Sequence, residues 1–310
     1  MTRAARPRIR LSDACYDLFV QAKRPVVTRY DILLTIAEIA RAGRYDGRSV
    51  YALPGQPTDV HYQRVVRQLL DEFRLSRDPD FPSGVFTVNR LPDASAEEAC
   101  CLADPYCYVS HLSAMQHYGL TDRIPDALAV TRPVESVWRT LADRTVAAQK
   151  DRLGPALAGF SAARPRRHEF PDVVRGRAVR AHATKSPGKS VRLRDGWARI
   201  ARIEQTFVDM LVEPALCGGM RHVLEVWRDQ VAPHLDRVVA LIDATESGIL
   251  KVRAGYIISE FLGIENPVVA SWLRYAQRGG SRRLDPGREY RPQFSEAWMI
   301  SLNVDLPGPP

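Results

Sequence analysis

The side chains that most often carry catalysis are dispersed along this chain of 310 residues. His111 and His117 are six residues apart, which is not the i, i+4 spacing at which a helix presents two metal ligands. No HExxH, GxSxG or GxxxxGK[ST] motif occurs. Asp172, Glu204 and Asp209 are the carboxylates that a nuclease could use, but Asp172 lies in a predicted loop and no ExK follows on a strand. We expect Glu204 and Asp209 to support the helix that they begin, and we expect no catalytic residue, metal ion or cofactor.

The cysteines and the hydropathy pattern indicate in which cellular compartment the protein is expected. The five cysteines form no CxxC pair, and adjacent Cys100 and Cys101 suit neither a simple disulfide nor a zinc site. The basic start, MTRAARPRIRL, lacks the apolar stretch of a secretory signal, and no apolar run reaches the roughly 18 residues of a membrane span. We therefore expect a cytoplasmic protein with reduced, mostly buried thiols and no membrane partner.

The clearest candidate for a binding surface is a basic helix, DVHYQRVVRQLLDEF, at residues 59–73. Thr58 or Asp59 is placed to cap its start. Apolar residues at helical spacing predict a face directed into the core. This inner face comprises Tyr62, Val66, Leu69, Leu70 and Phe73.

The opposite face of this helix is polar and mostly basic. Arg64 and Arg67 are three residues apart, so they share a face and could reach base edges or phosphates together. Gln63 has the amide that pairs with adenine. The residues predicted to face outward are His61, Gln63, Arg64, Arg67, Gln68 and Asp71. A solvated polar face is the alternative interpretation.

A hairpin follows the basic helix. LSRDPDFPSGVFTVN, residues 75–89, reads as a strand, a Pro/Gly turn and a second strand, and Arg74 and Arg77 border it. Helices are also predicted over residues 12–22 and 31–43, the first with Asp13 near its start and the second opened by Asp31. Three helices and a hairpin are the order of a winged helix-turn-helix, in which the last helix enters the major groove and the hairpin touches flanking phosphates. The connection over residues 44–57 is long for this motif, which leaves residues 32–42 as the other possible recognition helix.

The distribution of charge favours DNA as the partner. The net charge is +8, and residues 1–90 hold 15 basic and 10 acidic side chains, a balance of +5. The other 220 residues hold 29 and 26, a balance of +3. A basic domain attracts phosphate backbones because binding releases counterions. Residues 1–12 are Arg-rich and poor in apolar groups, so we expect a disordered basic arm there.

The remaining two thirds mix strands and helices. Strands are expected over residues 128–138, 144–150, 178–185 and 190–203, with Asp195 and Gly196 at a hairpin turn. From Ile203 the period becomes helical, and a short strand, AWMISLNV, closes the chain. Residues 151–177 are rich in Gly, Pro and Arg and show weak periodicity. The segment GFSAARPRRHEF, residues 159–170, is either a solvated loop or a positive patch. Within it, Arg164, Arg166 and Arg167 form a basic cluster that could bind an acidic partner.

Four patterns in this region belong together. They are YVSHLSAMQHYGLTDRIP at 108–125, RIARIEQTFVDMLVEPALCGG at 199–219, AGYIISEFLGI at 254–264, and LDP at 284–286 with Trp298 further on. Taken together, they resemble the C-terminal region of the AbiEi family, the antitoxins of type IV toxin–antitoxin systems of phage defence. The resemblance covers roughly two thirds of the chain.

The resemblance implies functions for both parts of the chain. AbiEi-like proteins carry an N-terminal winged helix that represses their own promoter by binding inverted repeats. Their C-terminal domain counters a nucleotidyltransferase toxin encoded beside them. An antitoxin and autorepressor without enzymatic activity is therefore our first hypothesis. The alternatives are an orphan winged-helix regulator and a nuclease-like enzyme of nucleic acids.

The expected architecture is α+β. Residues 1–12 form the basic arm, and residues 13–92 form the winged helix-turn-helix domain. Residues 95–310 form a mixed α+β domain with a sheet and a C-terminal group of helices. The boundary is placed near Pro92 and Ser95, where the apolar pattern breaks.

Overall fold

The structure is a computed structural model that describes residues 8–51, 53–277 and 282–307. The fold is mixed α+β, as the sequence predicts. The chain forms two compact units. The first comprises residues 1–108, 132–187 and 192–199, and the second comprises residues 109–131, 188–191 and 200–310. The expected boundary at residues 92–95 lies within the first of these units.

Three helices near the N-terminus begin and end at residues with a local reason to do so. The Thr28 side chain accepts from the Asp31 N–H, and the Asp31 carboxylate accepts from the Thr28 N–H in return, which opens the second helix. Gly43 ends it at φ 68°, a conformation that glycine adopts without strain. The helices are α1 (Leu11–Gln21), α2 (Arg29–Ala42) and α3 (Asp59–Asp71).

A three-stranded antiparallel sheet completes the winged-helix arrangement. Its strands are β1 (Val26–Thr28), β4 (Leu75–Arg77) and β5 (Val85–Val88), in the order β1-β5-β4. Val27 pairs with Phe86, and Ser76 pairs with Thr87. The long connection between α2 and α3 contains a small hairpin of β2 (Arg44–Tyr45) and β3 (Arg48–Ser49). The predicted order of three helices and a hairpin is confirmed.

Three local expectations were wrong. Phe73 does not face inward: its φ is 52° and it is 83% exposed, because the helix ends at Asp71 and the chain turns there. Residues 135–138 and 144–150 are not in strands but lie within a 19-residue helix, which begins at Glu135. In the expected disordered arm, Ile9 is buried and bridges to Val50, while residues 1–7 lie outside the described residues.

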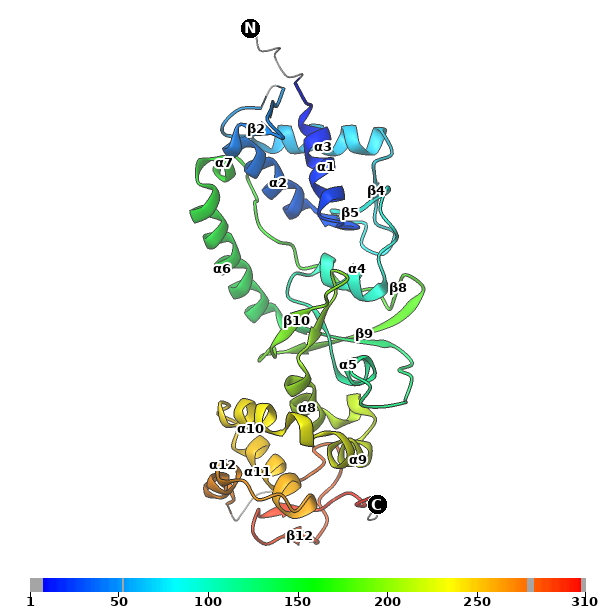
Figure 1. The fold of residues 1–310 in the computed structure, drawn as a ribbon, viewed down its shortest axis with the longest axis vertical. Coiled ribbons are helices and arrows are strands. Elements are labelled where there is room, and N and C mark those ends of the chain that lie inside the picture. The colour runs from blue at the N-terminus through cyan, green and yellow to red at the C-terminus, as the bar shows by residue number, and fades with distance from the viewer. Residues whose placement is uncertain (1–7, 52, 278–281, 308–310) are drawn as a thin grey trace. The chain divides into compact units, whose positions relative to one another are not determined.

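The first unit continues through a second set of elements. Helices α6 (Glu135–Leu153) and α7 (Pro155–Ala158) lie beside α2 (Figure 1). Leu153, Leu157 and Phe160 enter the same apolar core as Ile32 and Leu69. The core of the winged helix is therefore completed from residues 153–160. The elements are α4 (Ala96–Ala103), α6 (Glu135–Leu153), α7 (Pro155–Ala158), β8 (Val173–Val174) and β9 (Arg177–Thr184).

A buried ion pair lies below this core. The Arg132 Nη2 atom is 2.7 Å from Asp104 Oδ2, and both side chains are almost fully enclosed. The Oδ1 atom of Asp104 accepts from the Trp138 indole at 2.9 Å and from the Tyr106 N–H at 3.0 Å. The Arg132 guanidinium also lies 4.5 Å from the centre of the Phe170 ring. Removing either charge would leave the other buried without its counter-charge, which is strongly destabilising.

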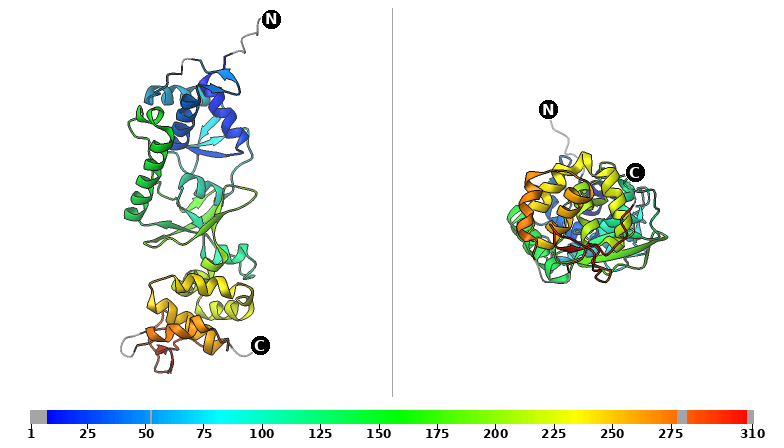
Figure 2. Two further views of the ribbon diagram at one scale, coloured as in Figure 1. Left: turned by 60° about the vertical axis from the view of Figure 1, so that its left-hand side comes forward. Right: turned by 90° about the horizontal axis from the view of Figure 1, so that it is seen from below.

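The second unit is mainly a group of helices around three buried tryptophans, Trp227, Trp272 and Trp298. Figure 2 shows the helices of residues 220–271 in yellow and orange. Its helices are α5 (His111–His117), α8 (Ile203–Val212), α9 (Met220–Gln230), α10 (Leu235–Asp243), α11 (Gly248–Tyr256) and α12 (Pro267–Ser271). The short helical turns are η1 (Pro214–Cys217), η2 (Ala232–His234), η3 (Ile257–Phe261) and η4 (Trp272–Tyr275).

Short strands complete the chain. β6 (Tyr108–Val109) and β7 (Leu128–Pro133) flank α5 in sequence, and β10 (Ser190–Arg192) and β11 (Arg199–Ala201) precede α8. Strands β12 (Phe294–Ser295) and β13 (Ile300–Ser301) pair antiparallel near the C-terminus. All five cysteines lie in the described part of the chain as buried free thiols. No helix among the described residues has the length and apolar character to cross a bilayer.

One half-buried carboxyl group in α8 makes the stability of the fold depend on pH. The Asp209 Oδ1 atom accepts from the Gln205 amide at 2.8 Å, whereas the buried Oδ2 atom has no hydrogen-bond partner. Burial raises the pKa of Asp209 from 3.8 to about 7. Between these pH values the folded chain binds the proton more tightly than the unfolded chain. The free energy of unfolding therefore decreases as pH rises through this window.

We predict that Asp209→Asn raises the thermal midpoint at pH 8 by roughly a few degrees, because it removes the cost of a buried charge. The difference from the unsubstituted protein should shrink as the pH is lowered towards 4. Calorimetry at pH 5 and pH 8 measures both midpoints. The exposed Asp122 provides the control, Asp122→Asn, which should leave the pH dependence unchanged. An Asp209→Asn protein with a lower midpoint at pH 8 would contradict the assignment.

Candidate nucleic-acid interface

The outer face of α3 presents the side chains that sequence predicts for DNA contact. Gln63, Arg64 and Arg67 are exposed, while Val65 and Leu69 anchor the helix in the core. Within the described residues, neither Arg64 nor Arg67 has an acidic partner at ion-pair distance. Two guanidinium groups that need not give up an existing ion pair are therefore available on one face of the helix.

His61 and Gln68 occupy more restricted positions on α3. The Thr58 N–H donates to His61 Nδ1 at 3.2 Å, so His61 takes part in capping the helix. Both His61 and Gln68 are half-buried and line a hollow of about 270 Å³. Arg10, Leu11, Tyr51, Arg64 and Val65 complete the lining of this hollow. These two side chains lie at the border of the exposed face of α3 and do not project into solvent.

The two arginines beside the hairpin, Arg74 and Arg77, differ in their ion pairs. Arg74 binds the carboxylates of Asp13 at 2.7 Å and Glu72 at 3.0 Å, and it lies over the Tyr16 ring. A phosphate would have to displace these partners. Arg77 is exposed at the end of β4 and has no ion pair among the described residues. Of the two arginines, Arg77 is therefore the one that could contact a phosphate without losing an ion pair to a described residue.

The tip of the hairpin is fastened to another part of the same unit. Arg175 forms ion pairs with Asp78, at 2.5 Å, and with Asp80. The Asp78 side chain is fully buried, and its Oδ1 atom also accepts from the N–H groups of Asp80 and Phe81, each at 3.1 Å. We call this set, Asp78, Asp80 and Arg175, the hairpin clamp. It holds the hairpin tip against the turn at residues 175–176.

The local sequence explains how Arg175 reaches the hairpin. Arg175 and Gly176 form the two-residue turn between β8 and β9, with φ values of 52° and 75°. Positive φ at both positions is the requirement of a type I′ turn. Phe81 reinforces the contact, since its ring meets Phe170 edge-on with centroids 5.6 Å apart. Sequence analysis missed Arg175: the Arg-Gly pair between Val174 and Arg177 signals a turn but does not reveal its partner.

The basic cluster of residues 164–167 does not form a single exposed patch. Arg164 is paired with Asp143 at 3.1 Å. Arg166 is exposed, whereas Arg167 is half-buried and its Nε atom has no hydrogen-bond partner. The positive charge of Arg167 acts on Arg132, whose pKa is lowered chiefly by burial. The three arginines thus face different surroundings, and only Arg166 has an exposed guanidinium without an ion pair to the described residues.

The four C-terminal patterns lie in the second unit, apart from Tyr108 and Arg199 at the starts of the first two. Tyr118 donates to the Ala201 carbonyl at 2.8 Å, which joins the first pattern to the second. Arg253, beside the third pattern, donates to the carbonyls of Leu211 and Arg283. Residues far apart in sequence therefore build one structure.

Trp298 is held by the third pattern in particular. Its indole N–H donates to Ser259 Oγ at 2.9 Å. A Cβ atom at Gly255 would lie 2.2 Å from the Trp298 ring, so a glycine is required there. Asn303 then binds the LDP segment, because its amide donates to the Asp285 carbonyl at 2.9 Å. The described residues include no group of three or more His, Cys, Asp or Glu side chains placed to hold a metal ion.

Comparisons with known proteins give structural similarity and no functional assignment. No protein-family model matches the chain. No curated protein matches it either. Among solved structures, the chain is similar to the crystal structure of the RV2827C protein from Mycobacterium tuberculosis. The two share 14% identity over 96% of this chain and 94% of the other, with a TM-score of 0.45.

The hairpin clamp predicts an acid-dependent loss of stability. Burial opposes ionisation of Asp78, but the hydrogen bonds and charge of Arg175 outweigh it, so the pKa of Asp78 lies below 3.8. The clamp therefore stabilises the fold fully above pH 3.8, and this stabilisation is lost as pH falls through the lower, folded-state pKa. We predict that Arg175→Met lowers the free energy of unfolding at pH 7 by roughly 3–5 kcal/mol, because two carboxylates lose their partner. Urea titrations at pH 7 and pH 3 measure this loss and its decline in acid.

The control for this experiment is Arg139→Met, which breaks only an exposed pair with Glu135. Such surface pairs contribute at most about 1 kcal/mol. Equal urea midpoints for Arg175→Met and Arg139→Met at pH 7 would show that the clamp does not hold the hairpin.

Proposed function

We propose that this chain binds double-stranded DNA through α3 and represses its own promoter. The observation that carries the proposal is that Arg64 and Arg67 are exposed on the last helix of a winged-helix arrangement and form no ion pair with the described residues. A major groove is wide enough to admit an α-helix. An arginine can donate two hydrogen bonds to guanine, and Gln63 can do the same with adenine. The face of α3 therefore combines attraction for phosphates with groups that distinguish bases.

The charge along α3 indicates which part of the helix meets DNA. Asp71 and Glu72 lie at its C-terminal end, and Glu72 is shared by Arg10 and Arg74. The basic residues lie nearer the start, where recognition helices usually contact base edges. We infer that the first two thirds of α3 enter the groove.

We further propose that the second unit supplies the antitoxin activity that the AbiEi resemblance implies. The support is that the four patterns are joined by hydrogen bonds and packing into one core. In this proposal the second unit counters a nucleotidyltransferase toxin encoded beside the chain. An orphan regulator remains the alternative, and the neighbouring reading frame distinguishes the two. A nucleotidyltransferase gene beside this one favours the antitoxin.

We predict that Arg64→Ala and Arg67→Ala each weaken binding to the chain's own upstream DNA by about 1–3 kcal/mol. The reason is the loss of a base or phosphate contact from the outer face of α3. Gel-shift titration on upstream and random duplexes measures both affinity and preference. Arg139→Ala, on α6, is the control and should bind as the unsubstituted protein does. If the two α3 variants are folded and bind normally, α3 is not the recognition helix.

A second experiment separates repression from protection. The double substitution Arg64→Ala with Arg67→Ala should abolish repression of a promoter reporter but still protect cells that express the neighbouring toxin. The reason is that both residues belong to the first unit, whereas the antitoxin patterns lie in the second. Growth and reporter output are scored in the same strain. A variant that loses protection together with repression, at normal abundance, would contradict this division of labour.

A further inference from the structure

The hairpin clamp raises the question of which residues contact the DNA backbone beside α3. In a winged helix the hairpin normally makes this contact. Here the hairpin tip carries two carboxylates, Asp78 and Asp80, and both are bound by Arg175. An acidic tip fixed in this way is unsuited to phosphates. Another segment must lie beside the first turn of α3 if the flanking backbone is to be bound.

Residues 161–164 occupy that position. The Ser161 N–H donates to Asp59 Oδ2 at 3.0 Å, and Asp59 is the first residue of α3. Arg29 joins the same two segments, because it donates to Asp59 Oδ1 at 3.1 Å and to the Ala162 carbonyl at 2.9 Å. One direct hydrogen bond and the two hydrogen bonds of Arg29 therefore hold Ser161 and Ala162 beside the start of α3.

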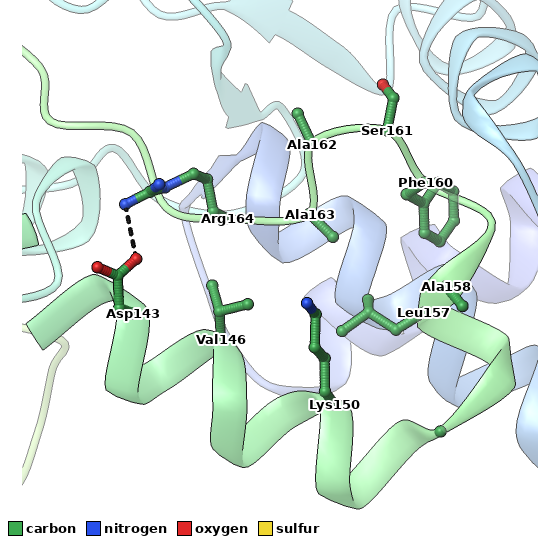
Figure 3. A pocket seen from close by; sticks show the side chains of 11 residues that line it. Asp143, Val146, Lys150, Leu157, Ala158, Phe160, Ser161, Ala162, Ala163 and Arg164 are labelled. Carbon is green, nitrogen blue, oxygen red and sulfur yellow. Dashed lines mark hydrogen bonds and ion pairs between the residues drawn. The ribbon is translucent and has the colours of Figure 1, made fainter. Parts of the chain in front are cut away.

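A hollow of about 650 Å³ opens between this segment, α6 and α7. Figure 3 shows Lys150 directed into it from α6, with Arg164 and Asp143 at one end. Lys150 is exposed and has no ion pair to a described residue. The walls are small or apolar, and Val146, Leu157, Ala162 and Ala163 contribute to them. Small side chains permit the close approach of a large polymer.

We propose that this hollow binds the sugar–phosphate backbone of duplex DNA next to the bases read by α3. The proposal rests on the proposed function of α3. Lys150 supplies a compact cation for one phosphate. Arg164 supplies a planar guanidinium that can donate two hydrogen bonds to another phosphate. To do so it leaves Asp143, and this exchange is inexpensive because exposed ion pairs contribute little.

Asp143 sets the strength of this contact. It is the acidic side chain that lines the hollow, and it neutralises Arg164 in the free protein. Removing its charge should therefore strengthen DNA binding, whereas removing either cation should weaken it. Opposite effects from residues of one hollow distinguish a phosphate contact from a general loss of structure. Arg144 gives a matched control, since it is an exposed cation on the same helix that does not line the hollow.

The test is the salt dependence of binding to the upstream duplex, measured for the full chain. Lys150→Ala and Arg164→Ala should each reduce the slope of log Kobs against log salt by about 1, and affinity by roughly three- to tenfold. The preference for upstream over random DNA should not change, because backbone contacts carry no sequence information. Asp143→Asn should raise the affinity, and Arg144→Ala should leave the slope unaltered. Hydroxyl-radical footprints of Lys150→Ala should lose protection on one flank.

The outcomes separate this proposal from the function of α3. The backbone site alone would be overturned if all four variants kept the salt slope of the unsubstituted protein, while the unsubstituted protein bound upstream DNA and Arg64→Ala did not. An unsubstituted protein with no preference for upstream DNA would overturn the recognition by α3. A third outcome would assign the hollow to a small ligand instead. Inorganic phosphate would then raise the thermal midpoint of the unsubstituted protein but not that of Lys150→Ala, and the salt slopes of DNA binding would be the same in both proteins.

Discussion

The contact between Arg175 and the hairpin tip determines how the first unit is organised. It joins a turn late in the unit to Asp78 and Asp80, about a hundred residues earlier in the chain. The carboxylates are partly or fully buried, so they require a cation, and the cation must come from a segment that folds against the hairpin. The winged helix is consequently completed by residues 132–187. A similar dependence holds in the core, where Leu157 and Phe160 pack with the helices of the first 71 residues.

This arrangement changes which surfaces remain for nucleic acid. Arg10, Arg24, Arg29 and Arg74 are basic residues of the first third, yet each is engaged by a carboxylate. A net charge alone does not reveal this, since a paired guanidinium contributes little attraction at a distance. Arg64, Arg67 and Arg77 have no such partner among the described residues. In the proposed function, α3 and the adjoining end of β4 therefore supply cations that need not leave an ion pair in order to attract DNA.

The second unit depends on a different constraint, the close packing of large side chains. Trp298 fits against the helix only because position 255 has no side chain, and its indole N–H finds an acceptor in Ser259. Asp209 is the exception in this core, because one of its oxygens is enclosed without a partner. A buried acid with a raised pKa reduces stability at neutral pH. The hydrogen bond from Gln205 offsets only part of this cost.

The sequence by itself determined the local elements whose causes are local. Helical spacing and capping residues predicted α1, α2 and α3, and the Pro/Gly turn predicted the hairpin, because these signals act within a few residues. Exposure of Arg64 and Arg67 followed from the same periodicity. The tertiary structure decided the rest. A strand was expected where the structure has the 19-residue helix α6. The helical pattern is hard to recognise in the sequence because α6 is mostly solvated and carries only a weak apolar stripe, with Trp138 and Ala142 buried and the arginines outside. The partners of Arg74, Arg164 and Arg175 could not be read from the chain, since an ion pair between residues distant in sequence depends on where folding places both charges.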